Sequence, residues 1–271
     1  MVEELDVRSQ YLPALLEWDT EFFGFRIQKL VLSEGVSHQD LIAAAREADC
    51  TYLFSANASE NLCQLITTAG GKSFGTNVNY EKKVAPIDGV MSDEIISVNY
   101  VTPEILSLAY EGGWNSRFLK DERFAEQFKR LYAKWVENDM HSGEVLVFLD
   151  CHQAPAGLIT YRIQNEVARI GILAVRGDMR HQGIAKRLLQ VVESKVAKQH
   201  PGIGMTVTTQ GGNSPARTLY EGYGFLQQKE THIWHLWRQD ISSSCPIADV
   251  AVGTDCSFVH RTPCVSIVIP I

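Results

Sequence analysis

The chain has 271 residues, 45% hydrophobic and 21% charged, enough to bury an ordinary core in one large or two modest domains. A formal net charge of −7, with no Lys/Arg run, argues against a nucleic-acid polymer as partner. The acidic N-terminus lacks the apolar core of a signal peptide, no apolar run could span a bilayer, and the six scattered cysteines form no C-x-x-C pair. These features predict a cytoplasmic protein with reduced thiols, no membrane partner and no metal.

Residues 1–90 are predicted to form a small α/β domain. Ser37 is a candidate cap for its first helix, and Gly70 and Gly71 end the second. The turn-rich residues 86–92 predict a linker. The expected elements are helices at 36–49 and 59–69 and strands at 51–56 and 77–84.

Residues 91–240 are predicted to form a larger α/β domain, a mixed, twisted sheet with helices on both sides. Pro103 suits the first turn of a helix, and aromatic residues at helical spacing predict a long helix that places Trp135 in the core. Trp18, in the first domain, is also expected in the core. The other expected elements are strands at 95–101, 144–149, 157–163, 167–175, 205–210 and 231–237 and helices at 123–138, 183–199 and 215–221.

Residues 241–271 differ in character, because small and polar residues follow one another without a period. They end in V-S-I-V-I-P-I, which reads as a strand with no partner in the sequence. We favour a loosely packed extension over a docked strand, and its role is unknown.

The segment R-H-Q-G-I-A carries the first chemical motif. A strand ending in Leu173, Ala174 and Val175 leads into a turn that opens a helix, so backbone N–H groups and the positive end of the helix dipole converge there. That geometry binds pyrophosphate. The alternative is an ordinary strand-to-helix connection containing a glycine, since neither the Rossmann nor the Walker pattern is present. The residues of this candidate site are Arg180, His181, Gln182, Gly183, Ile184 and Ala185.

A second motif begins at Asn213, where Asn or Ser can cap a helix and Pro215 fits its first turn. Tyr220 follows two turns later. Alone it would be a packed aromatic residue, but after a strand beside 170–175 it can face the same cleft as the Arg180 turn.

The two motifs together resemble the GCN5-related N-acetyltransferases (GNAT superfamily) over about residues 95–237. The family signature Gln/Arg-x-x-Gly-x-Gly/Ala is matched by Arg180, Gly183 and Ala185. The later signature, Asn-x-x-Ala-x-x-x-Tyr followed by Gly-Phe, is matched by Asn213, Ala216, Tyr220, Gly224 and Phe225.

The resemblance implies a GNAT fold, preceded here by a smaller GNAT-like α/β domain, and acetyl-CoA or another short acyl-CoA as co-substrate. In the family, backbone amides corresponding to Leu173 and Val175 pair with the pantetheine arm, and Asn213 would contact it. Backbone N–H groups near Leu173 would hold the charge that develops on the thioester oxygen. Tyr220 would be the general acid that protonates the departing thiolate.

A narrower resemblance, to the dTDP-fucosamine acetyltransferase family of dTDP-amino-sugar N-acyltransferases, extends into the N-terminal half. The matching stretches are L-E-W-D-T-E-F-F-G, S-R-F, R-L-Y-A-K-W-V-E-N, A-R-I-G-I-L-A, T-Q-G-G-N-S and I-W-H-L-W-R. It implies acyl transfer to a dTDP-linked amino-dideoxy sugar for surface polysaccharide such as the O-antigen of lipopolysaccharide. Ser116, Arg117 and Phe118 are the candidate sugar-nucleotide contacts, with Arg for phosphate and Phe for ring stacking. The alternative is that Phe118 is core and Arg117 a solvated charge.

Two other functions stay open: an acetyltransferase for a protein or small amine, and a non-catalytic regulatory module that binds acyl-CoA. No general base is evident, because each of four histidines (His141, His181, His232 and His235) reads as a surface or packed residue. The sugar, the position of its amine, the acyl length and a homodimer are likewise not fixed.

Overall fold

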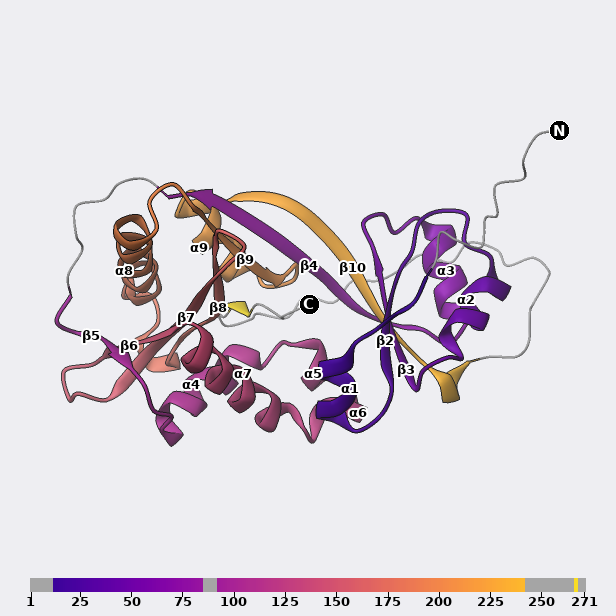
Figure 1. Cartoon of the computed structure of the whole chain (residues 1–271), viewed down its shortest axis with the longest axis horizontal. Coiled ribbons are helices and arrows are strands. Elements are labelled where there is room, and N and C mark those ends of the chain that lie inside the picture. The colour runs from indigo at the N-terminus through magenta and orange to yellow at the C-terminus, as the bar shows by residue number, and fades with distance from the viewer. Residues whose placement is uncertain (1–11, 85–91, 242–265, 268–271) are drawn as a thin grey trace. The chain divides into compact units, whose positions relative to one another are not determined.

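The computed structural model describes residues 12–84, 92–241 and 266–267. Its described residues form two compact units, the first containing 12–76 and 231–241 and the second 77–84, 92–230 and 266–267. The chain passes between them within β4 (Lys72–Lys83) and again within β10 (Leu226–Trp237) (Figure 1). The units therefore alternate along the sequence. The predicted boundary at residue 90 lies outside the described residues.

The first unit has a sheet covered by two capped helices. Strand β1 is antiparallel to β2, β2 is parallel to β3, and β3 is antiparallel to β10. Ser37 and Ser59 cap the two helices, each accepting a hydrogen bond from a backbone N–H of the first turn. The elements are β1 (Ala14–Leu15), α1 (Glu17–Phe23), β2 (Ile27–Val31), α2 (His38–Ala45), β3 (Cys50–Ser55) and α3 (Glu60–Thr68).

The sequence predicted most of the helices and strands of this unit. Helix α3 and strand β3 lie within one residue of the prediction at each end. Helix α2 covers only His38–Ala45 of the predicted 36–49, and β4 begins five residues earlier than expected. The expectation for Trp18 is wrong: its side chain is 39% exposed, and its ring stacks on Phe22 at 5.1 Å. This stacked pair lies on α1, a seven-residue helix of which only Phe23 is buried.

The second unit contains the two sequence motifs. Its elements are β5 (Ile95–Val98), α4 (Pro103–Gly113), α5 (Arg117–Lys120), α6 (Glu122–Ala125), α7 (Phe128–Ser142), β6 (Glu144–Leu149), β7 (Pro155–Gln164), β8 (Val167–Val175), α8 (Ile184–Gln199), β9 (Gly204–Gln210), α9 (Ser214–Gly222) and β11 (Ser266–Ile267).

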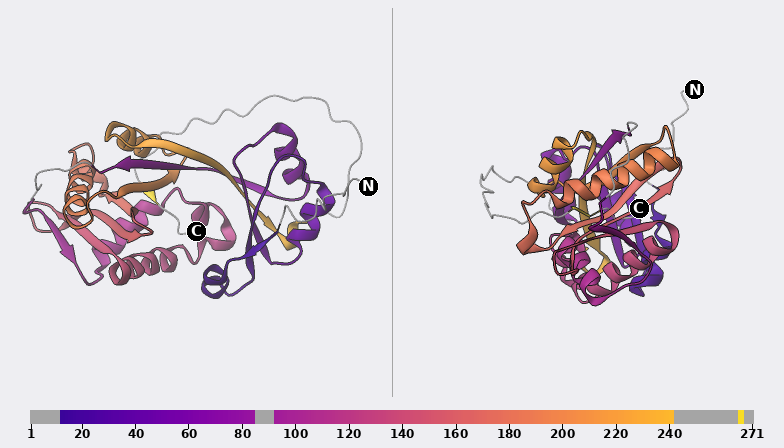
Figure 2. Two further views of the ribbon diagram at one scale, coloured as in Figure 1. Left: turned by 45° about the horizontal axis from the view of Figure 1, so that its top comes forward. Right: turned by 90° about the vertical axis from the view of Figure 1, so that its left-hand side faces the viewer.

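The sheet of this unit runs in the order β4-β9-β8-β7-β6-β5. It is mixed, because β8 and β9 are parallel while the other neighbours are antiparallel. Helices α4 and α7 cover one face of β6–β8 and α8 covers the other, as Figures 1 and 2 show. The expected mixed sheet flanked by helices is confirmed.

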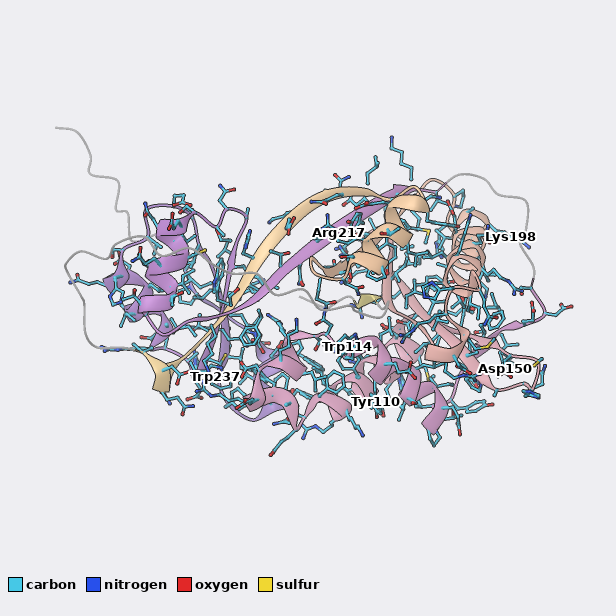
Figure 3. All side chains as sticks on the ribbon, turned by 180° about the vertical axis from the view of Figure 1, so that it is seen from behind. Tyr110, Trp114, Asp150, Lys198, Arg217 and Trp237 are labelled. Carbon is cyan, nitrogen blue, oxygen red and sulfur yellow. The ribbon has the colours of Figure 1, made fainter. Side chains whose placement is uncertain are left out.

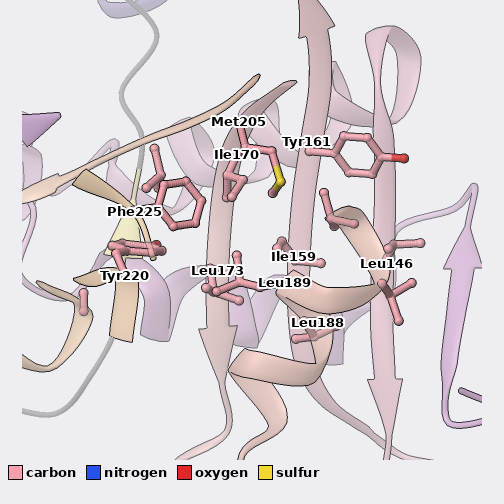
Figure 4. Close-up of a cluster of buried hydrophobic side chains, with 14 of the residues drawn as sticks. Leu146, Ile159, Tyr161, Ile170, Leu173, Leu188, Leu189, Met205, Tyr220 and Phe225 are labelled. Atoms are coloured by element: carbon pink, nitrogen blue, oxygen red, sulfur yellow. The ribbon is translucent and has the colours of Figure 1, made fainter. Parts of the chain in front are cut away.

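The core of this unit lies between α8 and the sheet (Figure 4). Leu188 and Leu189 of the helix pack against strand residues such as Ile159 and Ile170, and all four are fully buried. Burial of side chains of this size stabilises the fold by about 1.5–3 kcal/mol each. One of the two strands that carry these residues, β8, also lines the site described below.

One predicted helix is wrong in extent. The structure has α6 and α7 in place of a single helix over 123–138, with a break at 126–127. Asp121 caps the short α6, and Phe124 is fully buried with its ring edge-on to Phe118 at 5.5 Å. This tertiary packing overrides the continuous helical spacing. Trp135 on α7 is 5% exposed, so its expected place in the core is confirmed.

The described part of the C-terminal segment is paired. Ser266 and Ile267 form β11, which is antiparallel to β8 opposite Leu173 and Ile172. The final strand therefore has a partner, contrary to the expectation of a loose extension at these two residues. Elsewhere, no described helix is long and apolar enough to cross a bilayer. The described residues also include no cluster of three His, Cys, Asp or Glu side chains that could hold a metal ion.

Candidate acyl-CoA site

A cavity of about 220 Å³ opens in the second unit where β8 ends. Its walls come from three places: the last residues of β8, the turn and first residues of α8, and one face of α9. These are the segments that carry the two sequence motifs. The fold therefore brings together what the motifs predicted as one site.

The cavity exists because two parallel strands diverge. β8 pairs with β9 only from Val167 to Arg169, opposite Gly204 to Thr206. Beyond Arg169, β8 keeps its pairing with β7 while β9 keeps its pairing with β4. The edge of β8 that faces the opening is therefore not paired with β9, and β11 is the described segment that pairs there.

The turn before α8 has the backbone of an anion site. His181 and Gly183 both adopt left-handed conformations, with φ of 61° and 77°, and Gly183 is the residue before the helix. Glycine adopts this conformation without strain, and histidine tolerates it better than most residues. No side chain of the described residues caps the α8 N-terminus, so its amides are available to a ligand at the positive end of the helix dipole.

Arg180 already has partners within the protein. Its Nε donates to the carbonyl oxygen of Val175 at 3.1 Å, and its Nη2 lies 3.3 Å from Oε2 of Glu111 on α4. The side chain is 17% exposed and lines the cavity. It therefore joins the turn to β8 and α4, and its predicted contact with phosphate would add to these interactions.

A second arginine supports the start of the turn. The Arg176 guanidinium donates to Asp150 and Asp178 and to the carbonyl oxygen of Pro155. Asp150, labelled in Figure 3, lies between β6 and β7. The backbone N–H of Ala154 and the Arg176 guanidinium lower the pKa of Asp150 to about 2, so its carboxylate stays charged and holds the arginine.

Tyr220 lies in the core beside the cavity. It is fully buried beside Phe225 (Figure 4), and its ring centroid lies 5.5 Å from that of Phe225 and 5.9 Å from that of Tyr80. It does not line the cavity, although Ala216 and Leu219 of the same helix do. Its role as general acid stays a prediction, and the ring packing assigned to the alternative is present.

The remaining predicted residues have local structural roles in the ligand-free chain. Asn213 is 3% exposed and caps α9 by accepting from the Ala216 N–H at 3.3 Å. Ser116 caps α5, and Arg117 stacks over Phe118 with 4.6 Å from its guanidinium carbon to the ring centroid. Phe118 is 1% exposed, as in the alternative of a core residue, but the other part of that alternative is wrong, because Arg117 is 6% exposed and is not a solvated charge. Its stacking on a sugar nucleotide, and the contacts of Ser116 and Arg117 with that ligand, stay predictions.

Eight of the predicted cofactor residues line the cavity, and five other lining residues were not predicted. Gln182, Asn213 and Tyr220 do not line it. The predicted residues that do are Leu173, Ala174, Val175, Arg180, His181, Gly183, Ile184 and Ala185. The five further residues are Met179, Lys186, Pro215, Ala216 and Leu219.

A sequence signal existed for four of these five. Pro215, Ala216 and Leu219 belong to the second motif and recur at the spacing of one helix face. Lys186 lies in the first turn of α8, where a cation adds to the attraction of the amides for an anion.

Comparison with known proteins agrees with this geometry. Residues 114–234 match the family model described as Acetyltransferase (GNAT) domain. This segment of the chain is similar to a GNAT acetyltransferase domain. This match accounts for the strand divergence, the turn and α9, which all lie within the matched GNAT segment.

Solved structures agree with the α/β GNAT-like fold. A conserved protein of unknown function from Staphylococcus epidermidis superposes with a TM-score of 0.57 at 14% identity, covering 78% of this chain and 84% of that one. A tandem GNAT protein from the clavulanic acid biosynthesis pathway gives 0.50 at 13% identity, covering 79% and 78%. At such identities the similarity concerns the fold alone.

One curated relative shares local sequence. N-alpha-acetyltransferase 30 of Saccharomyces cerevisiae is 39% identical over 67 residues, which are 25% of this chain and 38% of that protein. The chain thus spans less than half the length of this relative. The matched protein is an acetyltransferase, and a match of this extent does not identify the substrate of this chain.

Proposed function

We propose that this chain is an acyl-CoA-dependent N-acyltransferase whose acceptor is the amine of a dTDP-linked amino-dideoxy sugar. The observation that carries the acyl-CoA part is the cavity, where the edge of β8 that is not paired with β9 meets the uncapped N-terminus of α8. GNAT domains use acyl-CoA. The strand edge fits the pantetheine arm of acyl-CoA, and the helix N-terminus fits its phosphates.

The phosphates fit the turn and the arm fits the strand. Backbone amides at the start of α8, together with Lys186, would hold the pyrophosphate. Leu173 and Val175 would offer backbone groups to the two amides of the pantetheine arm, as an added strand does. The apolar side chains of Ala216 and Leu219 would cover the arm from the α9 side.

Bound acyl-CoA would supply an acyl group activated as a thioester. The Leu173 N–H would stabilise the negative charge that develops on the carbonyl oxygen. The acceptor nitrogen forms the new C–N bond and releases its proton to solvent, and the C–S bond breaks. Tyr220 would then protonate the departing thiolate.

The sugar acceptor rests on the narrower resemblance, whose matching stretches come from both halves of the chain. A second candidate acceptor is a protein N-terminal amine, which the 67-residue match to N-alpha-acetyltransferase 30 favours. A regulatory module that binds acyl-CoA without turnover is the non-enzymatic alternative.

Acceptor competition separates these possibilities. The full chain is incubated with acetyl-CoA and, in turn, a dTDP-linked amino sugar, the corresponding free amino sugar and a peptide with a free N-terminus, and thiol release is recorded. We expect the dTDP-linked sugar to have the highest kcat/KM, because nucleotide binding positions the amine. Equal or faster acylation of the peptide would replace the sugar with a protein acceptor. Thermal stabilisation by acetyl-CoA without turnover of any amine would support the regulatory module.

A further inference from the structure

Strand β8 is irregular immediately before the residues that line the cavity. Ile159 of β7 pairs with Leu173, but Tyr161 pairs with Ile170. Two residues of β8, Gly171 and Ile172, therefore stand opposite Thr160 alone, which is a β-bulge. A bulge changes the direction in which the following backbone groups point, and the next residue is Leu173.

Side-chain oxygen atoms replace the missing strand pairing at this bulge. The backbone N–H of Ile172 donates to Thr160 Oγ1 at 2.9 Å, and Thr160 Oγ1 donates to Asp139 Oδ2 at 2.5 Å. Asp139 Oδ1 lies 3.3 Å from Arg162 Nη1. Asp139 belongs to α7, so three elements meet at one irregular position of β8.

Gly171 leaves room for this arrangement. A Cβ added at Gly171 would lie 2.4 Å from Thr160 Oγ1 and 2.5 Å from Asp139 Oδ2, well inside normal contact distance. The two oxygens thus occupy the space that a side chain at position 171 would take. The bulge, the glycine and the carboxylate depend on one another.

Burial of the Asp139 carboxylate has a free-energy cost. Asp139 is 5% exposed, and burial raises its pKa, opposed by the Thr160 hydroxyl and the Arg162 charge. Arg162 and Arg169 line the small cavity beside it. A buried charge with few partners lowers the stability of the fold. We therefore expect the position of this carboxylate to serve a function.

We propose that Asp139 and Thr160 are positioning residues, which hold the β8 bulge so that the Leu173 N–H points at the thioester oxygen. The inference rests on the proposed acyl transfer. Neither residue lines the acyl-CoA cavity, and both would act through the backbone of β8. Loss of the hydrogen bonds made by Thr160 would therefore weaken stabilisation of the transition state more than binding of acyl-CoA.

The test compares Thr160→Val with Thr160→Ser. Valine keeps the shape but cannot accept from Ile172, whereas serine keeps the hydroxyl. Removing a donor from an oxyanion site costs about 10²–10³ in kcat, and a misdirected one should cost at least about tenfold. We expect this loss in Thr160→Val with KM for acetyl-CoA within about twofold, and recovery in Thr160→Ser. Thr209→Val is the matched control, a fully buried threonine on β9 whose Oγ1 has no partner among the described residues.

Two spectroscopic readings distinguish positioning from general stability. Amide hydrogen exchange of Ile172 in the ligand-free protein should be faster in Thr160→Val than in wild type, Thr160→Ser or Thr209→Val. In the infrared difference spectrum of bound acetyl-CoA labelled with carbon-13 at its carbonyl, the stretch should move to higher frequency in Thr160→Val, because a hydrogen bond to the oxygen is weakened.

The outcomes separate this inference from the function on which it rests. Failure of wild type to bind or turn over acetyl-CoA would refute the proposed function. Normal wild-type turnover with unchanged kcat and carbonyl frequency in Thr160→Val would overturn the positioning role alone. If Thr160→Val does not fold, Asp139→Ala is measured in its place, because it removes the carboxylate that accepts from Thr160 and leaves the Thr160 side chain itself unchanged. A loss of kcat with shifted carbonyl frequency in that variant would again support the inference, and wild-type values would refute it.

Discussion

The guanidinium of Arg180 lies 3.3 Å from the carboxylate of Glu111, and Arg180 lines the cavity that would receive acyl-CoA phosphates. A carboxylate beside this arginine offsets part of its positive charge. The hydrogen bond from Nε to the carbonyl oxygen of Val175 holds the same side chain at the end of β8. Arg180 is thus both a support for the turn and a partly neutralised cation.

The first prediction concerns this pair. Arg180→Ala should raise KM for acyl-CoA about tenfold or more, the usual cost of losing a charge-assisted hydrogen bond, with little change in kcat. Glu111→Gln should lower KM about two- to fivefold, because a partly exposed ion pair at the protein surface is worth up to about 1 kcal/mol. Steady-state kinetics with acetyl-CoA checks both. Glu137→Gln, in an exposed pair with Lys134 on α7, is the control. An unchanged KM with a collapsed kcat in Arg180→Ala would contradict the phosphate role.

The second prediction concerns Tyr220. Tyr220→Phe keeps the ring that packs on Phe225 and removes the hydroxyl, so we expect kcat to fall about 10²–10⁴-fold with little change in acyl-CoA affinity. Tyr223→Phe is the matched control, since its hydroxyl bonds Glu193 at 2.7 Å and its loss should lower stability without a comparable loss of kcat. Thioesters whose thiol is already acidic should be least affected. Wild-type turnover of CoA thioesters in Tyr220→Phe would leave this residue with packing alone.

The third prediction concerns the C-terminal segment. A chain that ends at Ile241 keeps the cavity and removes β11, which pairs with the residues of β8 proposed to receive the pantetheine arm. We expect kcat to be unchanged and acyl-CoA to bind at least as tightly as in the full chain. Isothermal titration with acetyl-CoA and steady-state kinetics measure both quantities. A loss of kcat/KM above tenfold, roughly 1.4 kcal/mol, would mean that the removed residues contribute to catalysis.

The fourth prediction is a dependence of stability on pH. The pKa of Asp150 is lowered in the folded chain to about 2 from an ordinary value of 3.8. Its contribution is therefore complete above pH 4 and is lost as pH falls through about 2. Asp150→Asn should be less stable than wild type at pH 7, and the two should converge as pH approaches 2. Urea unfolding midpoints across this range provide the measurement. A constant difference at every pH would assign the effect to something other than the charge.

Local features of the sequence predicted the cavity well, because each wall is a continuous segment. The turn from Arg180 to Ala185 and the face of α9 are set by capping, glycine and helical spacing, which act over a few residues. The same local rules failed at residues 126–127, where burial of Phe124 decides the conformation.

The interactions of Asp139 with Thr160 and Arg162 could not be predicted from the sequence. Asp139 follows Tyr132 and Trp135 at helical spacing on the buried face of α7, but the sequence does not show which residues a carboxylate there would contact. Its partners, Thr160 and Arg162, lie on β7, and the glycine that makes room for it lies on β8. Only the packing of these elements brings them together, and a bulge has no reliable local signature.

The interleaving of the two units has a consequence for synthesis of the protein. Asp49 and Arg238 form an ion pair across 189 positions of the chain, and β3 and β10 pair beside them. At about 5–20 residues per second, the ribosome releases β3 on the order of ten seconds before β10. During that interval β3 is an edge strand with unpaired backbone groups, open to pairing with other nascent chains. Folding of the N-terminal region thus waits for β10 to leave the ribosome, and chaperone protection of β3 would matter most during that interval.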